Sequence, residues 1–281
     1  MIERTSLAGS TIAMTRIGFG CARIYGGSEL RGSARLIEAA LSAGIRHFDT
    51  APSYGNGQSE EVLGQVLGGA ADVTIATKVG IERPDAESTR SAARLAYRQF
   101  VKPLLTHMPG VKSKLLQFLA SRRDGSPAPP PQRRKLEAAH IRRELKGSLK
   151  RLKRNRVDLY LVHEPDQFEL DDEALETFLA LVREGAIGAF GLAFGRTVDA
   201  TPDFGTVIQS QYRQDRPTPA DDRTRIFHGV LRHGWRDSGS TSNDFGDVGG
   251  YFRGILDTNP KAAIIFSATT AHQILQVTTA F

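Results

Sequence analysis

Four ionisable side chains stand at the end of short apolar runs or just behind one. Asp49, Lys78 and His163 each end such a run, and Tyr54 follows Asp49 by five residues. A carboxylate, an ammonium group, an imidazole and a phenol that converge on one place are suited to proton transfer. A phenol titrates near pH ~10, so it needs help from its neighbours to act as an acid at neutral pH.

A lysine beside the phenol would give that help. An ammonium group ~4 Å away at an effective dielectric constant of ~20 contributes roughly 4 kcal/mol, or about three pKa units before solvent screening. Asp49 would keep Lys78 charged and oriented. His163 would place a carbonyl oxygen beside the Tyr54 hydroxyl. The predicted chemistry is the reduction of a carbonyl or the oxidation of an alcohol, with Tyr54 as the general acid or base.

Each of these residues also has an ordinary structural explanation. An aspartate at the end of a strand can cap a helix, His163 can belong to a turn, and Tyr54 can anchor a glycine-containing loop. The catalytic interpretation depends on all four residues occurring at matching places in the fold. It therefore depends on the elements that position them.

Eight short apolar runs predict strands that are buried on both faces, as in a parallel sheet. These predicted strands are residues 11–18, 45–49, 73–78, 157–163, 189–193, 206–212, 225–231 and 262–267. Segments with the apolar spacing of helices lie between several of them, at residues 33–43, 141–152 and 170–182. This alternation predicts an α/β fold, the (β/α)8 TIM barrel, in which reactive groups sit at the carboxyl ends of the strands.

An open doubly wound sheet is the alternative arrangement of alternating strands and helices. It would need a glycine-rich dinucleotide turn, G-x-G-x-x-G, after an early strand. The nearest match, Gly18-Phe-Gly20, is followed by Cys-Ala-Arg and does not complete the pattern. The barrel is therefore the predicted fold.

A long basic segment interrupts the alternation after the third predicted strand. Residues 83–154 contain 19 Lys and Arg against 5 Asp and Glu, a balance of +14, whereas the whole chain carries +6. We expect a single barrel domain over residues 1–281 with an inserted basic lid or loop at 83–140. Its part from 90 to 134 would cover the mouth and favour anionic or bulky substrates. A solvated basic surface would explain the segment equally well, and association with an acidic membrane surface or partner is a third explanation.

The composition excludes several classes of protein. No run approaches ~18 apolar residues, so no transmembrane segment is expected, and the first ten residues lack the order of a signal peptide. The single cysteine, Cys21, excludes internal disulfides and cysteine-based zinc sites, and no metal site is predicted. We expect a cytoplasmic protein that binds no nucleic acid, because the basic segment has few aromatic residues. The oligomeric state is left open.

Three blocks of the sequence form a distinctive set. Residues 44–55 read GIRHFDTAPSYG, residues 76–80 read ATKVG, and residues 158–163 read DLYLVH. Together they resemble the motifs of the aldo-keto reductase superfamily. The resemblance implies a (β/α)8 barrel that binds a nicotinamide cofactor without a Rossmann fold. It also implies a catalytic tetrad with the tyrosine as the acid, which would consist of Asp49, Tyr54, Lys78 and His163.

The resemblance is weaker for the residues that would hold the cofactor. Where the family commonly ends its fifth strand with Gly-Val-Ser-Asn-Phe, this chain reads Gly191-Leu-Ala193-Phe194-Gly195, without either polar side chain. Gln209 would bind the carboxamide of the nicotinamide, and His228 or Phe227 would stack on its ring. The residues that the resemblance assigns to the cofactor are Gly20, Cys21, Gln209, His228, Ser267, Thr269 and Gln273.

The segment after the last predicted strand bears on the choice of cofactor. The family often has a Lys or Arg there that holds the 2′-phosphate of NADP, and residues 267–273 contain neither. Main-chain N–H groups at the start of the following helix would still offer an anion site. We expect NADP(H) rather than NAD(H), and the missing cation leaves NAD(H) open.

Two other classes of protein fit parts of the pattern. A class I aldolase would form a Schiff base on Lys78, but that chemistry needs an unpaired lysine, and Asp49 would keep this one charged. A non-catalytic relative that serves as a binding or regulatory protein would explain the altered residues 193–194, but the complete tetrad argues against it. The predicted partners are a nicotinamide cofactor and a small-molecule carbonyl or alcohol substrate.

Overall fold

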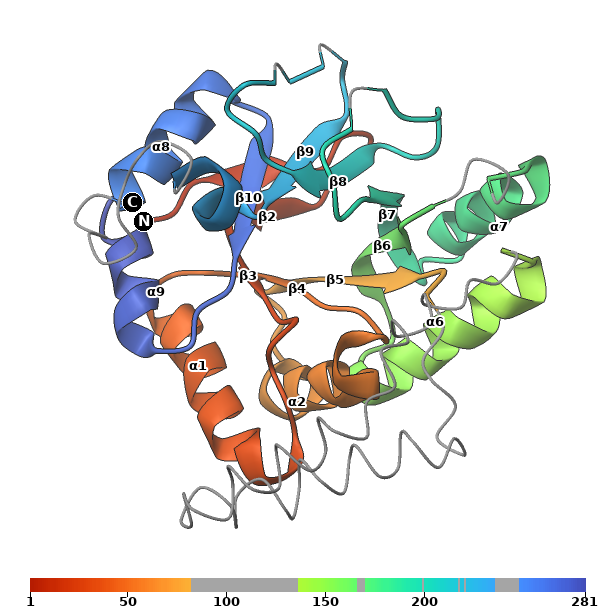
Figure 1. Cartoon of the computed structure of the whole chain (residues 1–281). Coiled ribbons are helices and arrows are strands. Elements are labelled where there is room, and N and C mark those ends of the chain that lie inside the picture. Colours follow the sequence, from red (N-terminus) through yellow and green to blue (C-terminus); the bar gives the residue numbers. More distant parts are fainter. Residues whose placement is uncertain (82–135, 166–169, 199, 217, 220, 236–247) are drawn as a thin grey trace, which may run out of the picture.

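The computed structural model describes residues 1–81, 136–165, 170–198, 200–216, 218–219, 221–235 and 248–281. Within these residues, eight parallel strands close into a barrel in the order β10-β3-β4-β5-β6-β7-β8-β9 (Figure 1). The strands are β3 (Ile17–Gly20), β4 (His47–Asp49), β5 (Thr74–Val79), β6 (Val157–His163), β7 (Ile187–Ala193), β8 (Val207–Gln211), β9 (Thr224–His228) and β10 (Ala262–Phe266). The predicted barrel is confirmed.

Helices of the described residues lie on the outside of the barrel (Figure 1). They are α1 (Leu30–Ser42), α2 (Gln58–Leu67), α6 (Ala138–Leu152), α7 (Asp172–Arg183), α8 (Val248–Thr258) and α9 (Ala271–Thr278). The three predicted helices correspond to α1, α6 and α7. The described residues between β7 and β9 form no helix, so the alternation of strand and helix is incomplete there.

Local signals explain where two of these helices begin and end. The side chain of Asp171 accepts a hydrogen bond from the N–H of Ala174 at 2.9 Å, which satisfies a free donor at the start of α7. The carboxyl end of α1 is followed by Gly44, which has a φ of +87°, a conformation that glycine adopts without steric cost. This turn sends the chain directly into β4, the strand that carries Asp49.

The predicted strand 11–18 is divided in the structure, because only Ile17–Gly20 enters the barrel. Its earlier part forms β2 (Ala13–Thr15), which pairs with β1 (Arg4–Ser6) in an antiparallel hairpin. Leu7 and Met14 of this hairpin are fully buried against the residues that fill the barrel interior. The N–H of Ala8 donates to Oγ1 of Thr224, the first residue of β9, at 2.8 Å. The hairpin therefore covers the amino-terminal end of the barrel.

The predicted strand 225–231 also ends earlier than expected. β9 stops at His228, and Gly229 has a φ of +71°, which turns the chain out of the sheet. The next residues form a short π-helix, η5 (Val230–Trp235), in place of strand. The apolar residues Val230 and Leu231 made this segment resemble a strand. In the structure Val230 is a buried residue at the start of the π-helix.

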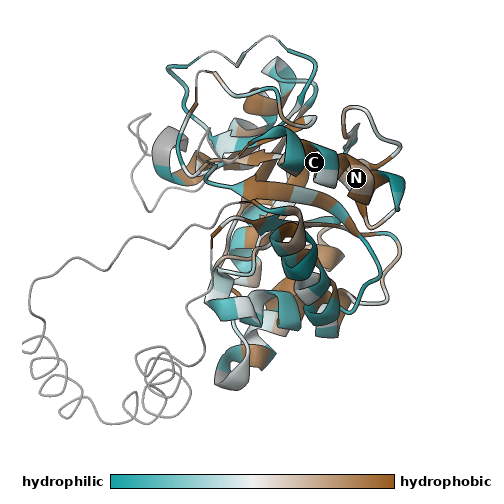
Figure 2. Cartoon of the chain, turned by 90° about the vertical axis from the view of Figure 1, so that its right-hand side faces the viewer, coloured by the Kyte–Doolittle hydropathy of each residue, from teal (hydrophilic) through white to brown (hydrophobic). Residues whose placement is uncertain are grey.

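Apolar side chains fill both the barrel and the layer between strands and helices. Figure 2 shows hydrophobic residues concentrated on the strands and on helix faces turned toward them. None of the helices in the described part has the length and apolar character needed to cross a membrane. Most of the predicted insertion at 83–140 lies outside the described residues, which resume at the buried Leu136, just before α6.

Candidate active site

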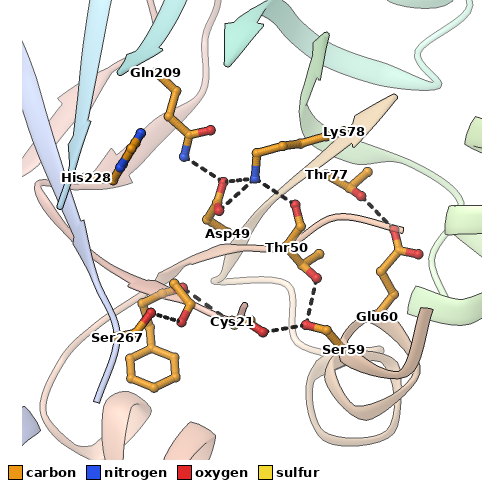
Figure 3. A network of polar contacts seen from close by, with 12 residues as sticks. Cys21, Asp49, Thr50, Ser59, Glu60, Thr77, Lys78, Gln209, His228 and Ser267 are labelled. Atoms are coloured by element: carbon orange, nitrogen blue, oxygen red, sulfur yellow. Dashed lines mark hydrogen bonds and ion pairs between the residues drawn. The ribbon is translucent and has the colours of Figure 1, made fainter. Parts of the chain in front are cut away.

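Asp49 and Lys78 form a buried ion pair at the carboxyl end of the barrel (Figure 3). Asp49 is the last residue of β4, and Lys78 is the fifth residue of the neighbouring β5. The lysine Nζ donates to the two carboxylate oxygens at 2.7 and 2.8 Å and to the carbonyl oxygen of Thr50 at 2.9 Å. The side chains are almost inaccessible, because only 3 % of Asp49 and 2 % of Lys78 is exposed.

This pairing keeps Lys78 positively charged despite its burial. Burial by itself lowers the pKa of an ammonium group, because the charged form loses its hydration. The Asp49 carboxylate, followed by Tyr54, outweighs that effect, and the pKa of Lys78 lies above its ordinary value. At neutral pH the site therefore contains a fixed cation.

Tyr54 and His163 complete the predicted cluster. The Nζ of Lys78 lies 5.1 Å from the centre of the Tyr54 ring. The ring of His163, the last residue of β6, meets the Tyr54 ring edge-on at a centroid distance of 6.0 Å and an angle of 88°. The four residues thus come from the ends of three strands and from one loop, and the fold brings all of them together.

The loop that holds Tyr54 depends on the residues that follow it. Gly55, Asn56 and Gly57 have φ angles of +60°, +57° and +90°. Glycine and asparagine adopt such left-handed conformations more easily than other residues. The turn places Tyr54 above the barrel and leads directly into α2.

The acidity of Tyr54 differs from the sequence-based expectation. Burial raises the pKa of the phenol, the charge of Lys78 lowers it, and the charge of Asp49 raises it again. A hydrogen bond with Lys78 acts in the lowering direction, but the pKa of Tyr54 remains above its ordinary value of 10.0. Lys78 thus lowers the pKa of Tyr54, as predicted. The expected net decrease of that pKa is wrong, because burial and Asp49 together raise it by more than Lys78 lowers it. Tyr54 is a protonated phenol at neutral pH.

Gln209 on β8 is directly linked to the ion pair. Its Nε2 donates to Oδ2 of Asp49 at 2.9 Å, and 3 % of the residue is exposed (Figure 3). Its Oε1 is buried and accepts no hydrogen bond from any described residue. A buried carbonyl oxygen without a donor is costly, so this atom is available to a ligand that brings an N–H group.

A second set of buried polar groups lies behind the ion pair and was not predicted. Oε1 of Glu60 accepts from the Thr77 hydroxyl at 2.6 Å, and Oε2 accepts from Arg151 at 2.7 Å. Glu60 is completely buried, and Thr77 directly precedes Lys78. These contacts tie β5 to α2 and α6 at the height of the lysine. In the sequence, the residues Ser59-Glu60 after the loop that holds Tyr54 were the signal that could have indicated these contacts.

A smaller chain of hydroxyl groups fixes the loop after β4. The hydroxyl groups of Thr50 and Ser59 lie 2.8 Å apart, and Ser59 Oγ donates to the carbonyl oxygen of Cys21 at 2.9 Å (Figure 3). The N–H of Cys21 in turn donates to the carbonyl oxygen of Asp49. The loop after β4, in which the carbonyl oxygen of Thr50 accepts a hydrogen bond from Lys78, is thereby joined to α2 and to the end of β3.

His47 lies two residues before Asp49 on the same strand, and strand alternation directs both side chains to the same side. Its Nδ1 is 3.0 Å from the hydroxyl of Thr74, and its Nε2 has no partner among the described residues. Burial lowers the pKa of His47 to about 4. The imidazole below the ion pair is therefore neutral at physiological pH.

The tetrad opens into a cavity of about 640 Å³. Tyr54, Lys78 and His163 line one part of it, and Ser267, Thr269, Gln273, Gln276 and Val277 line another. Cavities of this size hold cofactors and small-molecule ligands in many proteins. The catalytic cluster thus shares one space with residues from β10 and α9.

Most of the residues assigned to a cofactor line this cavity, as do their neighbours from η5. Gly20, Gln209, His228, Ser267, Thr269 and Gln273 are among the lining residues. Cys21 is not among them, because its side chain is fully buried and its thiol donates to the carbonyl oxygen of Phe19. The cavity is instead lined by Gly20 and Ala22 on either side of the cysteine.

His228 rather than Phe227 faces the cavity. Its Nε2 lies 2.7 Å from the carbonyl oxygen of Phe194, so this nitrogen carries the proton of the neutral ring. Burial lowers the pKa of His228, and the contact with Phe194 opposes this effect. Phe227 packs against Tyr212 with a centroid distance of 5.3 Å and is not part of the lining.

The start of α9 differs from the anion site that the sequence suggested. The Gln273 Oε1 accepts from the N–H of Thr269 at 2.8 Å and of Thr270 at 3.3 Å. The Thr270 hydroxyl accepts from the N–H of Gln273, so the two residues form a capping box. The N–H groups of Thr269, Thr270 and Gln273 are therefore used by the chain itself, and those of Ala271 and His272, the first two residues of α9, are left for an anion.

Comparison with known proteins gives one family. The sequence profile of the Aldo/keto reductase family matches residues 16–200. The aldo-keto reductase YhdN of Bacillus subtilis strain 168 is 31 % identical over 199 residues, which cover 68 % of this chain and 47 % of that protein. D-threo-aldose 1-dehydrogenase of a Pseudomonas species is 29 % identical over 196 residues, which cover 66 % of this chain and 51 % of that protein.

A solved structure extends the likeness over the whole chain. An aldo-keto reductase of Klebsiella pneumoniae in complex with NADPH is 18 % identical, with a TM-score of 0.64, and the match covers all of this chain and 89 % of that one. At this identity the likeness concerns the fold. The present chain spans about half the length of the curated relatives it matches.

Proposed function

This chain belongs to the Aldo/keto reductase family, and on that premise we propose that it interconverts a carbonyl compound and an alcohol with a nicotinamide cofactor. The observation that carries the proposal is the buried pair of Lys78 and Asp49 beneath Tyr54 in a cavity of about 640 Å³. When bound, the reduced nicotinamide supplies the hydride. The residues of the chain supply the proton and the environment that makes its transfer possible.

In the proposed reduction, Tyr54 is the general acid. Its hydroxyl gives a proton to the carbonyl oxygen, and the charge of Lys78 stabilises the phenolate that remains. Asp49 holds that charge in place with two short hydrogen bonds. His163, edge-on to the Tyr54 ring, would bind the same carbonyl oxygen and so orient the substrate.

The residues around the cavity fit a nicotinamide. The carboxamide group of that ring carries N–H donors, and the buried Oε1 of Gln209 has no donor from the described residues. His228 supplies an aromatic face in the lining, near Phe194. With Ala193 and Phe194 in place of polar residues, Gln209 would be the main side chain that recognises the carboxamide.

Replacing Gln209 by Leu is expected to weaken nucleotide binding by about 2- to 10-fold, the loss of one neutral hydrogen bond. The measurement is a titration of NADPH and of NADH against intrinsic fluorescence. Gln211→Leu on the same strand is the matched control, because Gln211 does not line the cavity. Equal affinities of Gln209→Leu and wild type would contradict this role.

The raised pKa of Tyr54 predicts the pH dependence of the two directions. Because reduction needs the protonated phenol, kcat/KM for reduction should stay level from about pH 6 to 9 and fall only above pH ~10. Oxidation needs the ionised phenol, so its rate should rise through the same range. A reductive profile that declines with a midpoint near pH 7 would show that another group is the acid.

The proposal also names the form of the cofactor and the class of the substrate. NADP(H) is proposed over NAD(H), in line with the NADPH found in the relative from Klebsiella pneumoniae. A sugar or another small aldehyde is the proposed substrate class, because a relative is an aldose dehydrogenase. Two arginines of the cavity lining, Arg23 and Arg232, which have no partner among the described residues, favour substrates or cofactors with negative charge. The proposed lid at 83–140 would add to that positive potential.

The aldolase alternative does not suit this site. A lysine that forms a Schiff base must lose its proton, and the Asp49 carboxylate holds the pKa of Lys78 above its ordinary value. A test of the proposed function is to titrate wild-type protein with both nucleotides and to follow NADPH oxidation with a panel of aldehydes and aldoses. Binding without turnover would support a binding or regulatory protein, and failure of both nucleotides to bind would overturn the proposal.

A further inference from the structure

The segment after β10 brings no lysine or arginine to a phosphate group, because residues 267–273 contain neither. The N–H groups of Thr269 and Thr270, just before α9, are taken by the Gln273 side chain at 2.8 and 3.3 Å, which leaves those of Ala271 and His272 as main-chain donors. A nicotinamide dinucleotide carries a diphosphate, and NADP(H) carries a further phosphate on the ribose. If the proposed function is correct, the cation that balances these groups must come from elsewhere.

Among the described residues, three cationic side chains line the cavity, namely Arg23, Lys78 and Arg232. Lys78 is already neutralised, because its Nζ contacts both oxygens of Asp49. The two arginines are exposed, and within the described part of the chain their side chains make no hydrogen bond or ion pair. An unpaired guanidinium group that lines a cavity keeps its full charge for a ligand.

Arg232 lies near the part of the cavity that the end of β10 and α9 line. It belongs to η5, which packs against β10 and α8. Those elements, with α9 and the loop before it, supply the lining residues Val248, Thr269 and Gln273. Arg23 follows β3, which lies between β4 and β10, and the Ser267 hydroxyl donates to the carbonyl oxygen of Gly20 at the end of that strand. Arg23 is therefore the second candidate, and a comparison of the two variants distinguishes them.

We propose that Arg232 binds a phosphate group of the nicotinamide dinucleotide and replaces the cation that the segment after β10 lacks. The inference rests on the proposed function. A guanidinium group matches phosphate because it can donate two parallel hydrogen bonds to two oxygens. The diphosphate and the 2′-phosphate present the same chemistry to it. The exposed position of Arg232 lets the side chain reach either group without losing a contact inside the protein.

The test compares Arg232→Met with wild type, with Arg23→Met, which removes the other arginine of the lining, and with Arg31→Met, an exposed arginine of α1 outside the lining, as the matched control. Quenching of the intrinsic fluorescence of the chain reports nucleotide binding. We expect Arg232→Met to raise the Kd for NADPH by about 10- to 100-fold, the usual effect of losing a charge-assisted hydrogen bond. Arg31→Met should leave that Kd unchanged. The difference between wild type and Arg232→Met should shrink as salt is added.

Titration with NADH identifies the phosphate. An equal loss of affinity for NADPH and NADH would assign Arg232 to the diphosphate, and a loss confined to NADPH would assign it to the 2′-phosphate. Unchanged affinity of Arg232→Met for both nucleotides, or a loss seen only in Arg23→Met, would overturn the inference. If the wild type binds neither nucleotide, the proposed function itself fails. Thermal melting of each variant shows that the protein remains folded, and Arg232→Lys should recover part of the affinity.

Discussion

Replacing Tyr54 by Phe is expected to lower kcat for carbonyl reduction by about 10²- to 10⁴-fold, the usual effect of losing a general acid. The substitution removes one oxygen atom, and the ring keeps its edge-on contact with His163 and its place above Lys78. Nucleotide affinity should therefore change little. The measurements are steady-state rates with a reactive aldehyde and a fluorescence titration with NADPH.

Tyr212→Phe is the matched control for this experiment. Tyr212 also packs against an aromatic ring, that of Phe227, but it does not line the cavity. Its variant should keep the wild-type rate. If Tyr54→Phe retained full activity, Tyr54 would not be the acid, and the proposed mechanism would have to be abandoned. A loss of nucleotide binding in Tyr54→Phe would instead show that the residue holds the cofactor.

Replacing Lys78 by Met should abolish measurable activity and should also destabilise the fold. The substitution removes the partner of Asp49 and leaves a carboxylate with 3 % exposure without its cation. Breaking a buried ion pair in this way typically costs about 3–5 kcal/mol of the free energy of unfolding. Denaturation by urea, followed by circular dichroism, measures that loss. Lys153→Met, a change of a lysine outside the barrel, is the control.

The pH dependence separates lost charge from lost packing. Because the pKa of Lys78 lies above its ordinary value of 10.5, the stability that the pair gives wild type is present below that pH and is lost only at higher pH. The difference in stability between wild type and Lys78→Met should therefore narrow only at alkaline pH, above that value. The double variant Asp49→Asn with Lys78→Met should recover part of the loss, and no recovery in it would contradict a role for the charge.

The sequence was sufficient to predict the barrel and the placement of the tetrad. Asp49, Lys78 and His163 end or nearly end apolar runs, and parallel strands that alternate with helices bring such ends to one edge. Tyr54 could be placed because it follows Asp49 by five residues, in the loop after that strand. These predictions use only neighbours along the chain and the rule that strand ends meet.

Contacts between distant side chains could not be predicted in the same way. Gln209 donates to Asp49 across the barrel, and Glu60 meets Arg151 of α6, although nothing in the spacing of these residues indicates either contact. The self-capped start of α9 depends on the rotamer of Gln273. The net pKa of Tyr54 depends on burial, which the sequence does not measure.

The hairpin of β1 and β2 has a consequence for ligand traffic. Since Leu7 and Met14 fill the amino-terminal end of the barrel, molecules that reach Tyr54 must arrive from the opposite end. If the proposed reaction is correct, a dinucleotide and its reaction partner would use the same side of the barrel. The hairpin would then restrict both compounds to one entrance, although none of its residues would take part in the reaction.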